Sequence, residues 1–171
     1  MLKLDLARLE RERLVRIRGD VPADDPLWEG TGMSFQAPLS VDLRAQQSGS
    51  GEVVVRGALR GVLQHECRRC LDPVRTELSQ SLTLVYVPTD LLGEDEGGDE
   101  VRPIPHDAAE LNLGDAIREE LILAVDPYVV CDPRCRGLCP RCGVDLNQET
   151  CDCVRDERDP RWDVLRTLKG E

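Results

Sequence analysis

Aromatic residues, histidines and long apolar runs are scarce in this chain of 171 residues. Because Phe, Trp and Tyr make up only 3% of the residues, we expect an aliphatic core and no aromatic platform for stacking single-stranded RNA bases. Two histidines are too few for the usual ligand set of a hydrolytic zinc site. No nucleophile elbow, phosphate-binding glycine loop or paired-acid motif stands out. These absences predict that the protein is not an enzyme.

The longest apolar stretches, such as residues 121–125, are far too short to span a bilayer. The first residues, Met1-Leu2-Lys3-Leu4-Asp5, carry charges where a secretory signal needs an apolar run. We therefore expect a cytoplasmic protein that makes no membrane contact. In that compartment thiols stay reduced, so that paired cysteines indicate metal binding more often than disulfides.

The net charge of -11 is unevenly distributed. Residues 89–110 contain eight acidic residues and one arginine, which predicts an acidic loop, whereas residues 1–18 and 56–88 are locally basic. The chain as a whole is too acidic to coat nucleic acid indiscriminately. A local basic face can still hold RNA, and the acidic loop can hold a basic protein. Charge alone does not choose between these two partners.

Alternating apolar and polar residues predict three consecutive long strands, over residues 39–43, 52–64 and 76–87. Two glycines in the middle strand, Gly57 and Gly61, indicate bend or bulge points. Apolar residues at helical spacing predict a helix near residues 114–125, which Asp126-Pro127 ends. The segment from Leu6 to Ile17 fits a helical period about as well as a strand.

Together these elements predict an α+β fold. It consists mainly of an antiparallel β meander or a partly closed barrel, with one main helix and a C-terminal cysteine-rich zinc module. A β-rich body over residues 1–130 would carry the module of residues 131–171, including a short helix near Trp162, docked on it. A sheet of this kind must curl or close to bury its aliphatic face.

Eight cysteines, grouped in four tight pairs, are the most informative feature of the chain. Zinc takes four ligands at tetrahedral corners, and a close pair supplies two of them from one turn of backbone. Four pairs therefore predict two zinc ions per chain, each in a closed four-thiolate site that builds structure. The pairs are Cys67/Cys70, Cys131/Cys135, Cys139/Cys142 and Cys151/Cys153.

The cysteines from Cys139 to Cys153 predict one local, ribbon-like site. Pro140 favours a turn within it, and Gly143 permits a positive φ just after the second ligand. The other two pairs then share a long-range site. Closing the gap of about 60 residues costs about 3–4 kcal/mol of loop entropy. Structural zinc supplies roughly 10–16 kcal/mol, so metal binding outweighs this cost. Two alternatives stay open: a cross-brace joining Cys67/Cys70 to Cys139/Cys142, and a single zinc with ordinary buried thiols elsewhere.

Five arginines lie between or beside the proposed ligands. They can form a phosphate-contacting RNA-binding face held rigid by zinc. Equally, they can neutralise the charge of about -2 that four thiolates and one Zn²⁺ leave at each site. Both interpretations can hold for different members of the set, which consists of Arg68, Arg69, Arg134, Arg136 and Arg141.

Several of these strings together resemble the YceD family, the large ribosomal RNA subunit accumulation proteins of bacteria and plastids. They are Cys67-Arg-Arg-Cys70-Leu-Asp-Pro73, Ile117-Arg-Glu-Glu-Leu121-Ile-Leu-Ala124, Cys135-Arg-Gly-Leu-Cys139-Pro-Arg-Cys142-Gly-Val-Asp-Leu-Asn147, and Cys151-Asp-Cys153 ahead of Asp159-Pro160-Arg161. The resemblance runs from about residue 39 onward. It implies a non-enzymatic factor needed for processing or accumulation of 23S rRNA.

Three functional hypotheses follow. The first is a ribosome-biogenesis factor that binds an rRNA precursor or a ribosome assembly intermediate through the arginines near zinc. The second is a protein–protein adaptor that recruits a processing nuclease or a basic ribosomal protein through its acidic loop. The third is a thiol-based redox sensor in which release of zinc is the signal.

Overall fold

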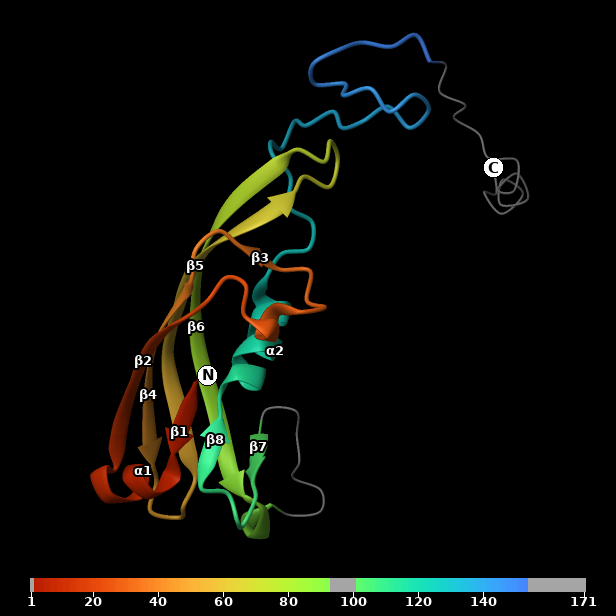
Figure 1. The fold of residues 1–171 in the computed structure, drawn as a ribbon. Helices are drawn as coiled ribbons and strands as arrows, with labels where there is room; N and C mark the ends of the chain where they lie inside the picture. The colour runs from red at the N-terminus through yellow and green to blue at the C-terminus, as the bar shows by residue number, and fades with distance from the viewer. Residues whose placement is uncertain (1, 93–100, 154–171) are drawn as a thin grey trace, which may run out of the picture.

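The computed structural model describes residues 2–92 and 101–153, which form one large sheet, a two-stranded sheet and two α-helices (Figure 1). The elements in chain order are β1 (Lys3–Asp5), α1 (Leu6–Glu12), β2 (Leu14–Val21), η1 (Pro26–Trp28), β3 (Ser34–Phe35), β4 (Leu39–Gln47), β5 (Val53–Glu66), β6 (Pro73–Pro88), η2 (Thr89–Leu91), β7 (Val101–Ile104), β8 (Glu110–Asn112) and α2 (Gly114–Ala124).

The large sheet has the strand order β2-β4-β5-β6-β7, and β3 pairs with β5. The antiparallel meander predicted from the alternating segments is its centre, where β4 pairs with β5 and β5 with β6. At one edge β7 pairs with β6 in parallel. Within the described residues β2 and β7 do not pair, so the sheet is open and forms no closed barrel.

One face of the sheet carries the core, and its other face is open to solvent. The buried positions on β4 alternate strictly with exposed or half-buried ones, as do most of those on β2 and β5. Helix α2 packs across the buried face (Figure 1), where Ile117 and Leu121 are fully buried. The core is aliphatic, as the composition predicts, apart from the buried rings of Trp28, Phe35 and Tyr86.

Helix α2 agrees closely with its prediction. The side-chain oxygen of Asn112 accepts a hydrogen bond from the backbone N–H of Gly114, the first residue of the helix, at 3.0 Å, and Val125 is extended before Asp126-Pro127. Of the apolar residues at helical spacing, Leu113, Ile117 and Leu121 are buried, but Ala124 is exposed. The last turn therefore extends beyond the sheet's apolar surface.

Two segments differ in detail from the sequence prediction. The segment from Leu6 to Ile17, whose pattern fits a helix about as well as a strand, contains both: the short second helix α1 and the start of β2. Asp5 caps α1 by accepting a hydrogen bond from the backbone N–H of Arg8 at 2.8 Å. Part of the predicted acidic loop is also strand, namely β7 and Glu110 of β8. Arg102 of β7 forms an ion pair with Glu119 of α2 at 2.7 Å, which ties that edge to the helix.

Gly57 is neither a bulge nor a bend, because β5 pairs with β6 in continuous register from Val53 to Glu66. Instead it allows a close backbone approach. A Cβ atom at this position would lie 2.1 Å from the carbonyl oxygen of Asp42 on the neighbouring strand. The glycine is therefore a requirement of the β4–β5 pairing.

Two predicted features lie outside the described residues: most of the acidic run, at 93–100, and the short helix around Trp162. Among the described residues, none of the helices combines the length and the apolar character needed to cross a membrane.

Replacing Gly57 with alanine is expected to lower the free energy of unfolding by about 2–3 kcal/mol, because strand β4 must move away to accommodate the new methyl group. Gly49 is a matched control, since a Cβ atom there meets nothing within 4 Å. Gly49→Ala should change stability by less than about 0.5 kcal/mol. Urea unfolding of both variants measures the difference, and equal stabilities would contradict the close approach.

Candidate metal centres at the end of the sheet

The first two cysteines lie in the tight loop that connects β5 to β6. The backbone N–H of Cys67 donates to the carbonyl oxygen of Asp72 at 2.8 Å, and that of Leu71 donates to Cys67 at 2.9 Å. Leu71 closes the turn in a left-handed conformation, with φ of 65°. Both Cys67 and Cys70 are buried. The loop therefore holds two thiols on one side of the hairpin end.

The cysteine-rich segment that follows α2 docks on this loop and lies beyond the end of the hairpin (Figure 1). Two backbone hydrogen bonds join them: Arg68 N–H to the oxygen of Val129 at 3.0 Å, and Leu138 N–H to the oxygen of Arg69 at 2.8 Å. Gly137 has φ of +74°, and a Cβ atom there would lie 2.8 Å from the carbonyl oxygen of Arg69. Glycine at this position lets the two backbones meet.

This docking brings the long-range cysteines together. The sulfur atoms of Cys67 and Cys135 are 3.8 Å apart, and those of Cys70 and Cys131 are 3.6 Å apart. The sulfur atoms of this first cluster (Cys67, Cys70, Cys131 and Cys135) all lie within 4.8 Å of one another. Tetrahedral zinc with bonds of about 2.3 Å places its sulfur ligands about 3.8 Å apart. The donor set thus fits a four-thiolate metal site.

A second cluster forms within the cysteine-rich segment itself, from Cys139, Cys142, Cys151 and Cys153, again with all sulfur atoms within 4.8 Å. The backbone N–H of Gly143 donates to Cys139 at 2.9 Å, and Gly143 adopts the positive φ expected from the sequence, 75°. The structure therefore groups the cysteines as one local and one long-range set. It does not join Cys67 and Cys70 to Cys139 and Cys142 as the cross-brace would.

The thiols within each cluster ionise unequally. Burial raises the pKa of Cys67, but hydrogen bonds from the backbone N–H groups of Cys70, Cys131 and Arg69 outweigh burial and lower that pKa to about 6. Backbone N–H groups of Cys142 and Arg141 lower the pKa of Cys139, also to about 6. By contrast, the side chain of Cys142 raises the pKa of Cys153 to about 12. Each cluster therefore needs a cation nearby before all four thiolates can form together.

The five predicted arginines have different surroundings. Arg68 donates to the carbonyl oxygen of Pro127 at 2.6 Å, and Arg69 donates to those of Pro133 and Cys135 at 3.2 and 2.9 Å. These two guanidinium groups hold the docked segment in place. Within residues 2–92 and 101–153, the exposed side chains of Arg134 and Arg136 make no hydrogen bond or ion pair. Arg141 is exposed beside the second cluster.

Sequence reasoning missed Asn147, which lies against Cys135 of the first cluster. Its side-chain nitrogen approaches the sulfur of Cys135 at 3.4 Å and donates to Asp145 at 2.7 Å, while its oxygen accepts from the backbone N–H of Arg136 at 2.7 Å. Nothing but its place at the end of the Cys135–Asn147 string signals this role. His65, two residues before Cys67, belongs to neither cluster. Its ring nitrogen instead lies 2.9 Å from the hydroxyl of Thr76 on β6.

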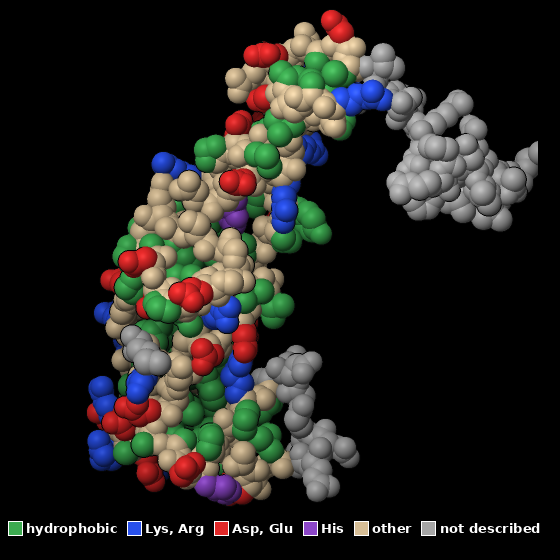
Figure 2. All heavy atoms as spheres, turned by 45° about the vertical axis from the view of Figure 1, so that its right-hand side comes forward, with side chains coloured by type: hydrophobic (Ala, Val, Ile, Leu, Met, Phe, Trp, Pro, Cys, Tyr) green, Lys and Arg blue, Asp and Glu red, His purple; other side chains and the backbone are tan. Residues whose placement is uncertain are grey.

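The surface around the cysteines carries charges of both signs (Figure 2). Over residues 131–153 the arginines are outnumbered by acidic residues, and filled four-thiolate sites would add further negative charge. Any anion contact at this end must therefore be made by individual arginines. The whole surface of the segment is not basic enough to attract a polyanion.

Comparison with known proteins adds a family and several relatives. The family model described as large ribosomal RNA subunit accumulation protein YceD matches residues 55–169. A protein of Mycobacterium tuberculosis described as uncharacterized is 35% identical over 137 residues, which cover 78% of this chain and 63% of the relative. The chain thus spans less than two thirds of the length of that relative. No solved structure matches the chain.

Two plant relatives have names that refer to ribosomal RNA. The Arabidopsis thaliana protein named large ribosomal RNA subunit accumulation protein YCED homolog 1, chloroplastic, is 34% identical over 67 residues, 39% of this chain and 21% of the relative. The Zea mays protein of the same name is 26% identical over 170 residues, 83% of this chain and 56% of the relative.

Replacing Gly137 with alanine is expected to separate the segment from the hairpin loop, because the new Cβ atom would contact the carbonyl oxygen of Arg69. Hydrogen exchange at the amide of Leu138, which donates to that oxygen, should become at least about tenfold faster. Gly143→Ala is the matched control, since it has nearly the same positive φ but nothing within 4 Å. If both variants exchange alike at Leu138, the backbone contact is not what docks the segment.

Proposed function

The chain belongs to the YceD family of large ribosomal RNA subunit accumulation proteins, and from this membership we propose that it is a non-enzymatic ribosome-biogenesis factor. In this proposal it supports processing or accumulation of 23S rRNA, and it binds the rRNA precursor or an assembly intermediate of the large subunit. The single observation that carries the proposal is the family match, which includes all eight cysteines.

We further propose that each cysteine cluster holds one Zn²⁺. The separations of 3.6 and 3.8 Å between sulfur atoms of the first cluster support this assignment, because they match the edge of a zinc–thiolate tetrahedron. When bound, zinc supplies four strong bonds to thiolates and no open position for a substrate. That coordination supports a structural role rather than a catalytic one.

The first cluster then joins two parts of the chain that are far apart in sequence. Cys67 and Cys70 belong to the β5–β6 loop, and Cys131 and Cys135 to the segment after α2. The hydrogen bonds of Arg68 and Arg69 support the same junction, which gives these two arginines a structural use. The RNA-binding role proposed for the five arginines therefore rests more on Arg134 and Arg136 than on Arg68 and Arg69.

The adaptor hypothesis assigns partner binding to the acidic run, most of which lies outside the described residues. Recruitment of a nuclease or a ribosomal protein through that run, as well as redox sensing, stays a prediction. We place the first hypothesis ahead of both because family membership supports it directly.

Metal analysis of the purified chain is expected to find two zinc ions, and Cys67→Ser or Cys131→Ser should each reduce the number to one. Both residues belong to the first cluster, so the double variant should also keep one zinc. Cys67→Ser combined with Cys139→Ser should retain none, because each cluster then lacks a ligand. One zinc remaining in that second double variant would contradict the grouping.

Changing both Arg134 and Arg136 to glutamine is expected to weaken binding of a 23S rRNA precursor fragment about tenfold, because each change removes one phosphate contact. Their guanidinium groups have no partner within the described residues, so folding should be unaffected. Arg11→Gln, at an exposed position of α1, is the control. If the wild-type chain does not bind the fragment, the proposed direct contact with rRNA is refuted.

A further inference from the structure

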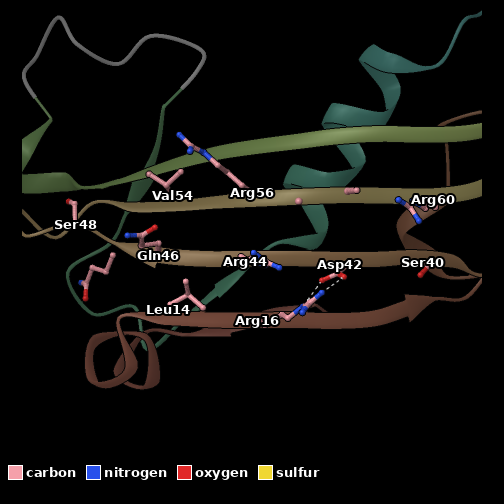
Figure 3. A pocket seen from close by; sticks show the side chains of 13 residues that line it. Leu14, Arg16, Ser40, Asp42, Arg44, Gln46, Ser48, Val54, Arg56 and Arg60 are labelled. Carbon is pink, nitrogen blue, oxygen red and sulfur yellow. Dashed lines mark hydrogen bonds and ion pairs between the residues drawn. The ribbon is translucent and has the colours of Figure 1, made fainter.

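A shallow groove of about 850 Å³ lies on the solvent face of the large sheet, on the side away from α2. Strands β2, β4 and β5 form its floor, and Figure 3 shows the side chains of Arg16, Arg44, Arg56 and Arg60 at this face. Among the residues that line the groove, Asp42 is the only acidic one. The groove is therefore basic, although the chain as a whole carries a net charge of -11.

Three of these arginines form a row across the sheet. Arg16 on β2 lies directly opposite Arg44 on β4, and Arg44 lies directly opposite Arg56 on β5. Neighbouring strands are about 4.8 Å apart, so the row spans about 10 Å. On β5, Arg60 lies on the same face as Arg56 and Ala58, because residues two apart on a strand share a face. It therefore extends the basic surface along the strand.

Asp42, whose carboxylate lines the groove, is already hydrogen-bonded to two arginines of β2. Asp42 accepts two hydrogen bonds from Arg16, at 2.9 and 2.6 Å, and one from Arg18 at 3.3 Å. The hydrogen bonds from Arg16, and then from Arg18, hold the pKa of Asp42 well below its usual range, so it stays ionised. One carboxylate thus neutralises at most one of the two arginines on β2.

The other three arginines have no such partner. Arg44, Arg56 and Arg60 are exposed, and in the described part of the chain their guanidinium groups make no hydrogen bond or ion pair. Like charges directly opposite each other on neighbouring strands are unfavourable. The Arg44–Arg56 pair therefore brings no stability to the sheet by itself, but an anion lying across the strands would turn both charges into favourable contacts.

We propose that this groove binds the sugar–phosphate backbone of RNA, with Arg44, Arg56 and Arg60 contacting consecutive or neighbouring phosphates. The inference rests on the proposed function, because it assigns a second contact surface to the same class of ligand. It places that surface on the sheet, away from the cysteine clusters.

The lining of the groove favours a nucleic-acid backbone over the alternatives. It contains no aromatic residue for base stacking, and its polar members besides arginine are short or neutral side chains such as Ser40 and Gln46. A protein interface usually has an aromatic or apolar centre, whereas only Leu14, Val54 and Ala58 are apolar here. Recognition should therefore depend on phosphate charge and be independent of base sequence.

The negative net charge does not oppose this binding at close range. Electrostatic interactions are screened over about 8 Å at physiological ionic strength. Acidic groups more distant than that act weakly on a phosphate that lies in the groove. The free guanidinium groups act at contact distance, where a charged hydrogen bond to phosphate is strong.

The test compares the full chain with a variant in which Arg44, Arg56 and Arg60 are all changed to glutamine. Binding of fluorescent poly(U) and of a 23S rRNA precursor fragment is measured at a series of salt concentrations. The triple variant should bind both probes at least about tenfold more weakly, and the slope of log K against log salt should fall by about 2 for poly(U). Poly(A) should bind the wild-type chain about as well as poly(U).

Two controls separate charge from folding. The triple Arg→Lys variant keeps the charges and should keep most of the salt slope, and Arg11→Gln, outside the groove, should bind like the wild type. The melting temperature of the triple glutamine variant should not fall, because the change removes a like-charge pair. A lower melting temperature combined with lost binding would indicate a structural role and would overturn the proposal.

The outcomes also separate this inference from the proposed function. If the Arg134/Arg136 variant loses binding but the triple glutamine variant does not, the groove is not an RNA site while the proposed function stands. If the wild type binds neither RNA, the groove proposal fails together with the direct contact with rRNA in the proposed function. Binding of poly-glutamate in place of RNA, lost in the triple variant, would assign the groove to an acidic protein segment and overturn the RNA proposal.

Discussion

The contact between the β5–β6 loop and the cysteine-rich segment is the constraint on which the far end of the molecule depends. It joins residues that are far apart in the chain, and α2 lies between them. Two backbone hydrogen bonds, two arginine side chains and a glycine with positive φ all act at this junction. Only with these contacts in place do Cys67 and Cys70 meet Cys131 and Cys135. The second cluster, by contrast, forms within one local segment, residues 139–153, which includes the turn at Gly143.

The two faces of the large sheet have different roles. Its inner face buries the aliphatic residues beneath α2, which form the main hydrophobic core of the described residues. Its outer face makes no contribution of that kind, which leaves the outward positions free to carry arginines. The unpaired arginines Arg44 and Arg56, which lie opposite each other on this face, are a feature that folding does not explain, because opposed like charges weaken strand pairing.

Much of the fold was predictable because its signals are local. Alternation of apolar residues identified β4, β5 and β6, and helical spacing with Asp126-Pro127 identified α2. That the sheet stays open, that β7 pairs in parallel and that α1 is helical were not predictable. Edge pairing depends on long-range packing, and α1 is a short helix whose pattern also fits a strand. Gly57 was misinterpreted for the same reason, since the atom it must avoid belongs to another strand.

For the candidate sites, the sequence by itself determined which residues are the metal-ligand candidates and that the last four cysteines can meet locally. Short spacing limits the conformations that place two sulfur atoms on one side of the chain. Only the tertiary structure decided that Cys131 and Cys135 meet the hairpin loop, that Asn147 lies against Cys135, and that Arg16, Arg44 and Arg56 share one row. Strand register sets that row, and register depends on which face is buried.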